Sequence, residues 1–130
     1  MTLQDRIPGN GDASAMKTKN GWVEIDGVRY DHDTIVHIDR TVTKRQKKQS
    51  KKLKKVYGHT PLSEAELGFL ETERPAIIYI GTGQYGSLPL TPDAKRRFLA
   101  YETVIRTTPE VLDLISEETR PFVAVLHVNC

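Results

Sequence analysis

The 130-residue sequence predicts an α/β domain in which a β-hairpin precedes a parallel or mixed sheet covered by helices. Three observations predict this class: turn residues between β-rich segments early in the chain, alternating helix and strand patterns later on, and two short apolar runs suited to buried strands. A chain of this length has room for one hydrophobic core rather than two. We therefore expect one domain over residues 21–130, after a flexible lead-in over residues 1–20 that is punctuated by Pro8, Gly9 and Gly11.

The first elements of the domain are expected to be antiparallel strands. Asp26-Gly27 separates two β-rich segments, and an Asp-Gly pair readily adopts the positive φ values of a type I′ hairpin turn. A second pair of β-rich segments is expected to pair about Asp39-Arg40. The expected strands are residues 22–25, 28–30, 34–38 and 41–43.

The helix expected next begins at a capping box. Ser63 and Glu66 have the required spacing, in which the Ser63 hydroxyl accepts from the Glu66 amide and the Glu66 carboxylate accepts from the Ser63 amide. The pattern predicts a helix from Ser63 to about Thr72, with Gly68 as an unfavourable interior residue.

Two further helices are expected to begin at Thr-Pro pairs. Thr91-Pro92 and Thr108-Pro109 each place a proline in the first helical position after an N-cap residue, and they predict helices over residues 92–100 and 109–118. The strands expected around these helices are residues 76–80, 101–106 and 122–128. The last of them is expected to be central, because a nearly unbroken apolar run suits a strand that is buried on both faces.

Composition argues against a membrane protein and a disulfide-based scaffold. The longest apolar runs, residues 76–80 and 122–126, are far shorter than the roughly 20 residues of a membrane-spanning helix. The first thirty residues contain no apolar run typical of a secretory signal. Cys130 is the only cysteine, so no disulfide can form within the chain. We therefore expect a reducing, cytoplasmic location and no membrane contact.

The most specific local motif is a GxGxxG sequence at residues 81–86, directly after an expected strand. We call these residues the glycine loop. In dinucleotide-binding domains a helix begins within this motif, so that its amides receive the pyrophosphate. Here Pro89 and Pro92 follow and the next helix begins near Thr91, which argues against that function. Two interpretations stay open: a tight turn at the carboxyl edge of the sheet, or a nest of backbone amides that binds an anion. The candidate anion-binding residues of this loop are Gly81, Thr82, Gly83, Gln84 and Gly86.

The basic segment, residues 44–55, carries eight cations and no acid, which leaves the rest of the chain with 11 cations and 17 acids. Its uncharged positions recur every three or four residues, as in a helix that docks a weakly apolar side and directs its lysines outward. A solvated basic face with some anion affinity is the favoured interpretation. Nucleic-acid binding is the alternative, and it is disfavoured because no aromatic residue interrupts the run before Tyr57. Arg45 and Lys47 are the candidate side chains to compensate an anion at the glycine loop.

No catalytic set, metal site or cofactor site is expected. His32 stands between two aspartates, a pattern that is more typical of a polar turn than of a metal site. His127 and Cys130 are three residues apart, which directs them to opposite faces of a strand and disfavours a thiol–imidazole pair. His59 and His127 are the only bases active near neutral pH that are worth testing.

Several motifs together are similar to those of a known family. They are a basic stretch with Arg45 and Lys47, the tripeptide Tyr57-Gly58-His59, a capped acidic helix, Ile-Ile-Tyr-Ile-Gly-Thr-Gly at 77–83, and His-Val-Asn-Cys at 127–130. Over residues 22–130 the chain resembles the small family that includes the adipogenesis-associated Mth domain-containing protein and a mitochondrial respiratory complex I assembly factor. The resemblance implies a three-layer α/β fold with a central mixed sheet of about five strands, helices on its faces and an N-terminal β-hairpin beside it.

The resemblance also implies an assembly or regulatory role, because the eukaryotic members point that way and the prokaryotic members have no settled activity. We therefore expect a non-enzymatic binding or assembly module that takes a protein partner, a small anion or both. The alternative is a small enzyme that acts on an anionic metabolite. Such an enzyme needs a general base or nucleophile beside the anion, and the sequence shows no compelling one.

Overall fold

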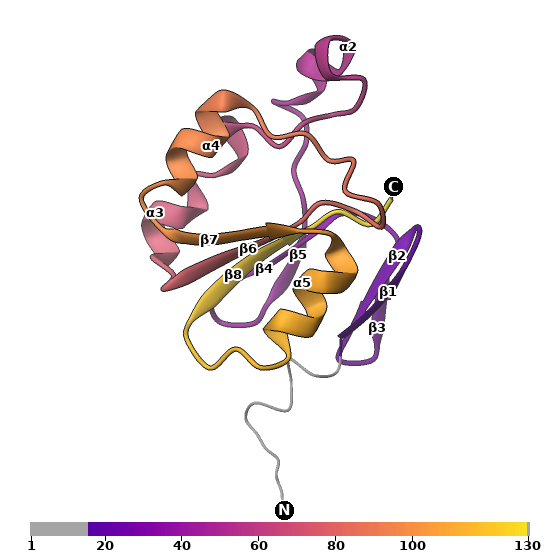
Figure 1. The fold of residues 1–130 in the computed structure, drawn as a ribbon, viewed down its shortest axis with the longest axis vertical. Helices are drawn as coiled ribbons and strands as arrows, with labels where there is room; N and C mark the ends of the chain where they lie inside the picture. The colour runs from indigo at the N-terminus through magenta and orange to yellow at the C-terminus, as the bar shows by residue number, and fades with distance from the viewer. Residues whose placement is uncertain (1–15, 130) are drawn as a thin grey trace, which may run out of the picture.

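A five-stranded mixed sheet forms the middle layer of the fold in the computed structural model, which describes residues 16–129 (Figure 1). Its strands, in the spatial order β5-β4-β8-β6-β7, are β4 (Thr34–Val36), β5 (Val42–Lys44), β6 (Ile77–Gly81), β7 (Glu102–Arg106) and β8 (Phe122–Leu126). β6, β7 and β8 are parallel to one another, and β4 is antiparallel to both β8 and β5. A separate antiparallel sheet consists of β1 (Met16–Lys19), β2 (Trp22–Ile25) and β3 (Val28–Tyr30). The expected α/β fold with a central mixed sheet and an N-terminal hairpin is confirmed.

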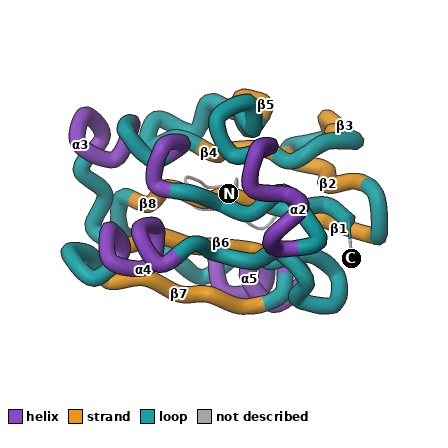
Figure 2. Tube along the Cα trace, turned by 90° about the horizontal axis from the view of Figure 1, so that it is seen from above, coloured by secondary structure: helices purple, strands orange, loops and turns teal. Residues whose placement is uncertain are grey.

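Helices cover one face of the central sheet and share the other face with the small sheet. The helical segments are η1 (Lys51–Leu53), α2 (Lys54–Tyr57), η2 (Glu64–Glu66), α3 (Phe69–Glu73), α4 (Pro92–Phe98) and α5 (Thr108–Ile115), of which η1 and η2 are 3₁₀ turns. α4 connects β6 to its neighbour β7, whereas α5 connects β7 back across β6 to β8. Right-handed crossovers in opposite directions place their helices on opposite faces. α4 and α5 accordingly lie on different sides of the sheet in Figure 1, and Figure 2 shows the strand order from above.

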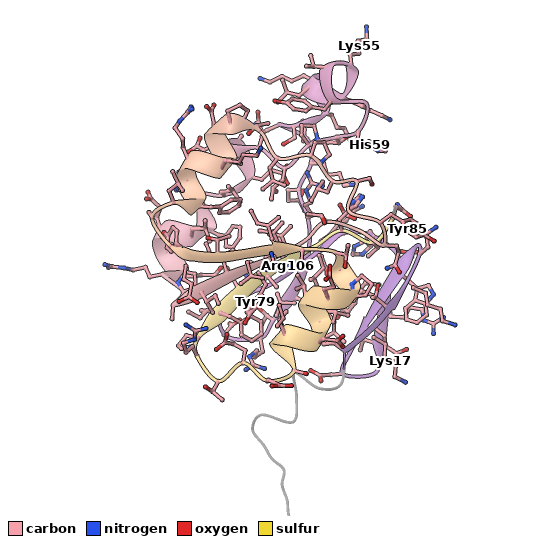
Figure 3. All side chains as sticks on the ribbon, in the orientation of Figure 1. Lys17, Lys55, His59, Tyr79, Tyr85 and Arg106 are labelled. Atoms are coloured by element: carbon pink, nitrogen blue, oxygen red, sulfur yellow. The ribbon has the colours of Figure 1, made fainter. Side chains whose placement is uncertain are left out.

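The core has two halves, one on each face of the central sheet. Phe122, Ala124 and Leu126 of β8 face α5 and β2, whereas Val123 and Val125 face the α3 and α4 side. All five residues are at most 1% exposed. β8 is apolar along its whole length because both of its faces are covered, as expected for a central strand. Tyr79, on the neighbouring strand β6, lies on the α5 side (Figure 3), where its ring meets that of Phe122 edge to face.

The N-terminal hairpin is confirmed, and one strand precedes it. Asp26 and Gly27 have φ values of 51° and 85°, and they close the pairing of β2 with β3. Residues 16–19, expected to belong to the flexible lead-in, instead form β1 at the edge of the small sheet. Its side chains alternate between half-buried and exposed positions over only four residues, which is too short a pattern to distinguish from a loop. Residues 1–15 of the expected lead-in lie outside the described residues.

The helix predicted from Ser63 to Thr72 is wrong in its start and its continuity. Ser63 makes no side-chain cap, and the segment divides into the 3₁₀ turn η2 and the short helix α3, with Gly68 between them. The physical reason is a competing interaction. The Glu66 carboxylate binds the guanidinium of Arg45, and the Ser63 hydroxyl pairs with the Ser50 hydroxyl at 2.5 Å. Distant partners therefore take both groups of the expected capping box.

The two Thr-Pro helices are confirmed, the second with a shifted cap. Thr91 accepts from the amide of Ala94 at 3.2 Å, as an N-cap residue should. In α5 the capping box is formed by Thr107 and Glu110, one residue before the predicted cap. Thr108 is helical and buried instead, and its hydroxyl donates to the carbonyl of His127 at 2.7 Å.

The basic segment forms two short turns rather than one docked helix. η1 and α2 follow each other and end at Gly58, whose φ is 78°. Leu53 and Tyr57 are half-buried, whereas Val56 is 78% exposed. Figure 1 shows α2 projecting from the body of the domain. No helix among the described residues is long and apolar enough to span a membrane.

Candidate functional site

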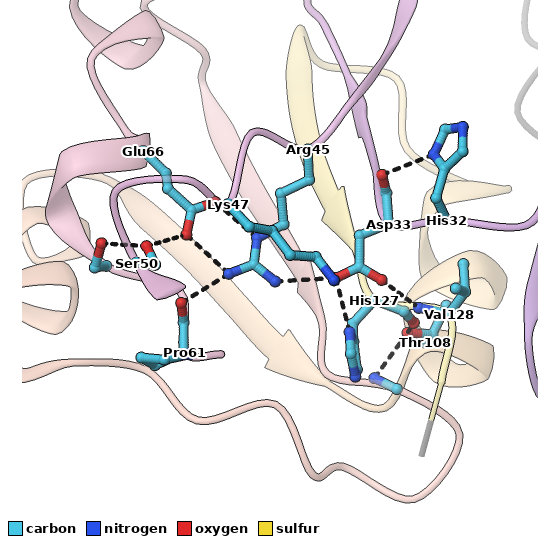
Figure 4. Close-up of polar contacts among 12 residues, drawn as sticks. His32, Asp33, Arg45, Lys47, Ser50, Pro61, Glu66, Thr108, His127 and Val128 are labelled. Atoms are coloured by element: carbon cyan, nitrogen blue, oxygen red, sulfur yellow. Dashed lines mark hydrogen bonds and ion pairs between the residues drawn. The ribbon is translucent and has the colours of Figure 1, made fainter. Parts of the chain in front are cut away.

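A buried arginine organises the end of the sheet where β5 and β8 finish (Figure 4). Arg45 directly follows β5 and is 2% exposed. Its Nε and Nη2 donate to the two carboxylate oxygens of Glu66 over 2.7 and 2.8 Å. Its Nη1 donates to Asp33 Oδ2 over 2.9 Å, and Nη2 also donates to the carbonyl of Pro61 over 2.7 Å. Four of the five N–H groups of the guanidinium are thus used inside the protein, and its bidentate contact is made with Glu66.

Asp33 connects this arginine to the C-terminal strand. Its Oδ2 lies 2.8 Å from Nδ1 of His127 and 3.6 Å from Nζ of Lys47, and its Oδ1 accepts from the amide of Val128 over 3.0 Å. Burial by itself raises the pKa of Asp33. The hydrogen bonds from His127 and Val128 and the nearby cations outweigh burial and hold the pKa of Asp33 well below its ordinary value. Asp33 is therefore a buried carboxylate with its charge compensated.

Sheet pairing explains why residues so far apart in sequence meet here. Thr34, at the start of β4, pairs with Leu126 at the end of the antiparallel strand β8. The next residues outward, Asp33 and His127, are therefore neighbours although 94 positions separate them. Arg45 joins the same end because its amide donates to the carbonyl of Asp33, which continues the pairing of β4 with β5.

Arg45, Asp33 and Glu66 form a buried cluster. An open pocket of about 500 Å³, the lysine pocket, lies over it. Asp33 and Arg45 contribute to its lining, and the lysines that line it are Lys44, Lys47, Lys48 and Lys51. The Lys47 side chain is 33% exposed, so its ammonium group is accessible to solvent while it lies near Asp33. Arg45 and Lys47 balance the two buried carboxylates, Asp33 and Glu66. The positive character of the pocket therefore comes from Lys44, Lys48 and Lys51, against the one exposed acid among the described residues of the lining, Asp31.

Backbone hydrogen bonds to residues 127–129 connect the glycine loop to this pocket. The amide of His127 donates to the carbonyl of Gly81 over 2.9 Å, and the amide of Gln84 donates to the carbonyl of Asn129 over 3.2 Å. Asn129 also lines the lysine pocket. The structure therefore brings Arg45 and Lys47 together in one pocket and places the loop next to it.

Most of the expected amide nest is engaged within the protein. Gly81, Thr82 and Gly83 are buried. The Thr82 amide donates to the carbonyl of Arg106, and the Gly83 amide donates to the hydroxyl of Thr108, both over 2.9 Å. Together with the Gln84 amide, three of the five amides between residues 82 and 86 thus have internal acceptors. Gly86, with φ of 80°, is exposed. Anion binding by this loop stays a prediction that depends on its exposed part.

The histidines singled out by sequence have different surroundings. His32 lines the lysine pocket, and its Nδ1 lies 3.1 Å from the carbonyl of Asp33. His127 is 9% exposed and is oriented by Asp33, whereas His59 lies on the surface near α2 (Figure 3). Residues 16–129 contain no group of three or more His, Cys, Asp or Glu side chains placed to hold a metal ion. Cys130 lies outside the described residues.

Three parts of this site have no functional signal of their own in the sequence. The pattern marks Asp33 only as a neighbour of His32, Glu66 only as a capping residue, and the lysines of the pocket other than Lys47 only as part of a solvated face: Lys44, Lys48 and Lys51. A signal for Asp33 and His127 exists, since Asp33 stands directly before the β-rich run of β4 and His127 directly after the apolar run of β8. It becomes informative only once the antiparallel pairing of β4 with β8 is known.

The chain is thus a three-layer α/β domain, in which a buried Arg–Asp–Glu cluster lies under a basic pocket at the carboxyl ends of β5 and β8. The conserved hypothetical protein PH1505 from Pyrococcus horikoshii OT3 is 32% identical to this chain; the match has a TM-score of 0.77 and covers 88% of this chain and 97% of that one. MT938 is 30% identical, with a TM-score of 0.72 over 88% and 96% of the two chains.

The chain belongs to the Mth938-like domain family. A Mth938-like domain from Bordetella pertussis is 19% identical, with a TM-score of 0.54 over 98% of this chain and 92% of that one, and it shares the fold. No family model and no curated protein matches the chain significantly.

Proposed function

We propose that this Mth938-like domain protein is a cytoplasmic, non-enzymatic binding module that takes a small anion in the lysine pocket. The position of Lys47 carries the proposal. Its ammonium group lies 3.6 Å from the buried Asp33 and is one-third exposed, so it can contact a ligand while Asp33 holds it in place. Lys44, Lys48 and Lys51 surround the same pocket and add attraction for negative charge.

The buried cluster supports this function by fixing the floor of the pocket. The guanidinium of Arg45 is committed to Glu66, Asp33 and Pro61, and the role we assign to it is positioning rather than direct ligation. The anion is then bound by ammonium groups, each of which donates in several directions. A pocket of this size suits a small metabolite that carries phosphate or carboxylate groups.

The glycine loop contributes to the proposed site from the side. The Gln84 amide holds the backbone of Asn129, which lines the pocket, and Gly81 holds the backbone of His127. Gly86, at the exposed end of the loop, does not line the pocket. The role we assign to its amide is a contact with a ligand that extends beyond the lysines. The buried residues Gly81, Thr82 and Gly83 act as supports.

A small enzyme acting on an anionic metabolite is the second candidate, and the His127–Asp33 pair favours it. A carboxylate 2.8 Å from an imidazole nitrogen is the arrangement that orients a general base. The binding module remains the better proposal, because this carboxylate oxygen is shared with Arg45 and Lys47 and His127 is 9% exposed. Mass spectrometry of the natively purified protein separates the two candidates: a copurifying metabolite that the protein converts supports an enzyme, and an unchanged one supports a binding module.

The proposal is tested by titrating the ¹⁵N-labelled protein with inorganic phosphate and following the amide resonances. We expect the largest shifts at residues 44–51 and at Asn129, with smaller shifts at Gly86. Chloride at matched ionic strength is the control, because a purely diffuse attraction responds to ionic strength alone. Phosphate shifts no larger than those in chloride would refute the pocket.

A further inference from the structure

A second concave surface lies on the other side of the basic segment. We define it as the α2 groove, a depression of about 350 Å³ between η1 and α2 on one side and η2 and the start of α4 on the other. Lys51 lines the lysine pocket, whereas the adjacent Lys52 lines the α2 groove. One basic segment therefore separates two different surfaces.

The apolar part of the α2 groove comes from both of its walls. Leu53 and Tyr57 are four positions apart, which places them on the same side of a helical turn, and both are half-buried. Ala65 and Pro92 line the opposite wall and are exposed. A bulky apolar side chain inserted between these walls would be removed from water. Val56, 78% exposed on α2, adds apolar surface nearby.

The charge beside the groove is positive on the α2 side. Lys52 lines the groove, and the exposed Lys54 and Lys55 follow on α2. The groove also contains Glu64 and Asp93, but each forms an ion pair with an arginine, Arg97 and Arg96 respectively. Arg97 is shared with Glu71, and Lys52 is the one cation among the described residues that line the groove. The excess of positive charge therefore comes from Lys52 together with Lys54 and Lys55, on the α2 side of the groove.

We propose that the α2 groove binds an acidic segment of a protein partner, with one bulky apolar side chain inserted between Leu53, Tyr57 and Pro92. Charge complementarity with the lysines of α2 selects the acidic character, and the apolar walls select the anchor residue. This inference deepens the proposed binding role but uses a different surface from the anion pocket. Peptide binding in the α2 groove and anion binding in the lysine pocket can therefore fail independently of each other.

The test uses a fluorescein-labelled short peptide of Glu and Asp residues with one central Leu, whose binding to the full chain is followed by fluorescence anisotropy. We expect Lys52→Glu to weaken binding about tenfold or more, because it reverses a charge beside the groove. Replacing the peptide Leu by Ala is expected to weaken binding by a similar factor through the lost apolar burial, and it requires no change in the protein. Tyr57→Ala is expected to do the same from the protein side.

The control variant Lys17→Glu reverses an exposed lysine at the far end of the domain from α2 (Figure 3) and should leave peptide binding unchanged. Lys47→Ala should leave the difference between the Leu and Ala peptides unchanged, because the apolar anchor does not reach the lysine pocket; this separates the proposal from the anion pocket. Equal losses from Lys52→Glu and Lys17→Glu would overturn the proposal in favour of diffuse charge attraction. Equal binding of the Leu and Ala peptides would overturn the anchor. Tighter, Lys52-dependent binding of a single-stranded oligothymidine would overturn it in favour of nucleic acid.

Discussion

Replacing Arg45 by methionine removes the cation that holds two buried carboxylates. The side chains of Asp33 and Glu66 are 1% and 2% exposed, so neither can regain its lost solvation by moving slightly toward water. Breaking a buried ion pair by removing one partner costs about 3–5 kcal/mol. In this variant Asp33 still contacts His127 and Lys47, and Glu66 still accepts a hydrogen bond from Ser50. We therefore expect the free energy of unfolding to fall by an amount near the lower end of this range, about 3 kcal/mol. This is a large part of the 5–15 kcal/mol by which a typical domain is stable.

Urea unfolding followed by circular dichroism and by the fluorescence of Trp22 measures this change in the free energy of unfolding. Lys54→Met in the exposed part of the basic segment is the matched control and should change it by less than about 0.5 kcal/mol. The double variant Arg45→Met with Glu66→Met should recover part of the loss, because one uncompensated carboxylate is removed with the cation. A loss below about 1 kcal/mol for Arg45→Met, as for an exposed ion pair, would show that Arg45 does not compensate the two carboxylates in a buried cluster.

Three further changes test the packing and the charge of the domain. Val125→Asp places an unpaired charge at a position 1% exposed and should unfold the domain, which a thermal melt detects; an unchanged melting temperature would remove β8 from the core. Gly81→Ala places a methyl group 2.7 Å from the Thr108 hydroxyl and should cost about 1–3 kcal/mol in urea unfolding, whereas Gly68→Ala, with nothing within 4 Å, should not destabilise. The pKa of Glu118 is lowered from 4.5 to about 2, mainly by hydrogen bonds from Arg120, so its stabilising effect is complete above pH 4.5 and is lost as the pH falls toward 2. Glu118→Gln should therefore show a smaller drop in melting temperature over that range, and an identical drop would contradict the assignment.

Local signals in the sequence were sufficient where the structure is decided locally. Asp26-Gly27 predicts its hairpin turn, because positive φ at two successive residues restricts the residue types that fit. Thr91-Pro92 predicts the start of α4, because a cap and a proline act only on the first helical turn. The apolar run of β8 predicts a central strand, because a strand buried on both faces needs apolar side chains at consecutive positions.

Local signals failed where a distant partner decides. Ser63 and Glu66 have the spacing of a capping box, but Arg45, 21 positions before Glu66, takes the carboxylate. The site itself depends on such contacts, since Asp33 and His127 meet only through the pairing of β4 with β8. The sequence pattern could therefore identify the basic segment and the glycine loop as candidates. It could not show which lysines share a pocket or which loop amides are already bonded.

Isothermal titration calorimetry with inorganic phosphate measures whether Lys47 binds an anion in the lysine pocket. Lys54 is the matched comparison, because it belongs to the same basic segment but does not line this pocket. A hydrogen bond to a charged group contributes about 1.5–3 kcal/mol, so Lys47→Ala should weaken phosphate binding at least about tenfold. Lys54→Ala should leave the dissociation constant within about twofold, as expected for a screened surface charge. Equal losses in the two variants, or no measurable phosphate binding to the unmodified protein, would show that Lys47 does not form an anion site.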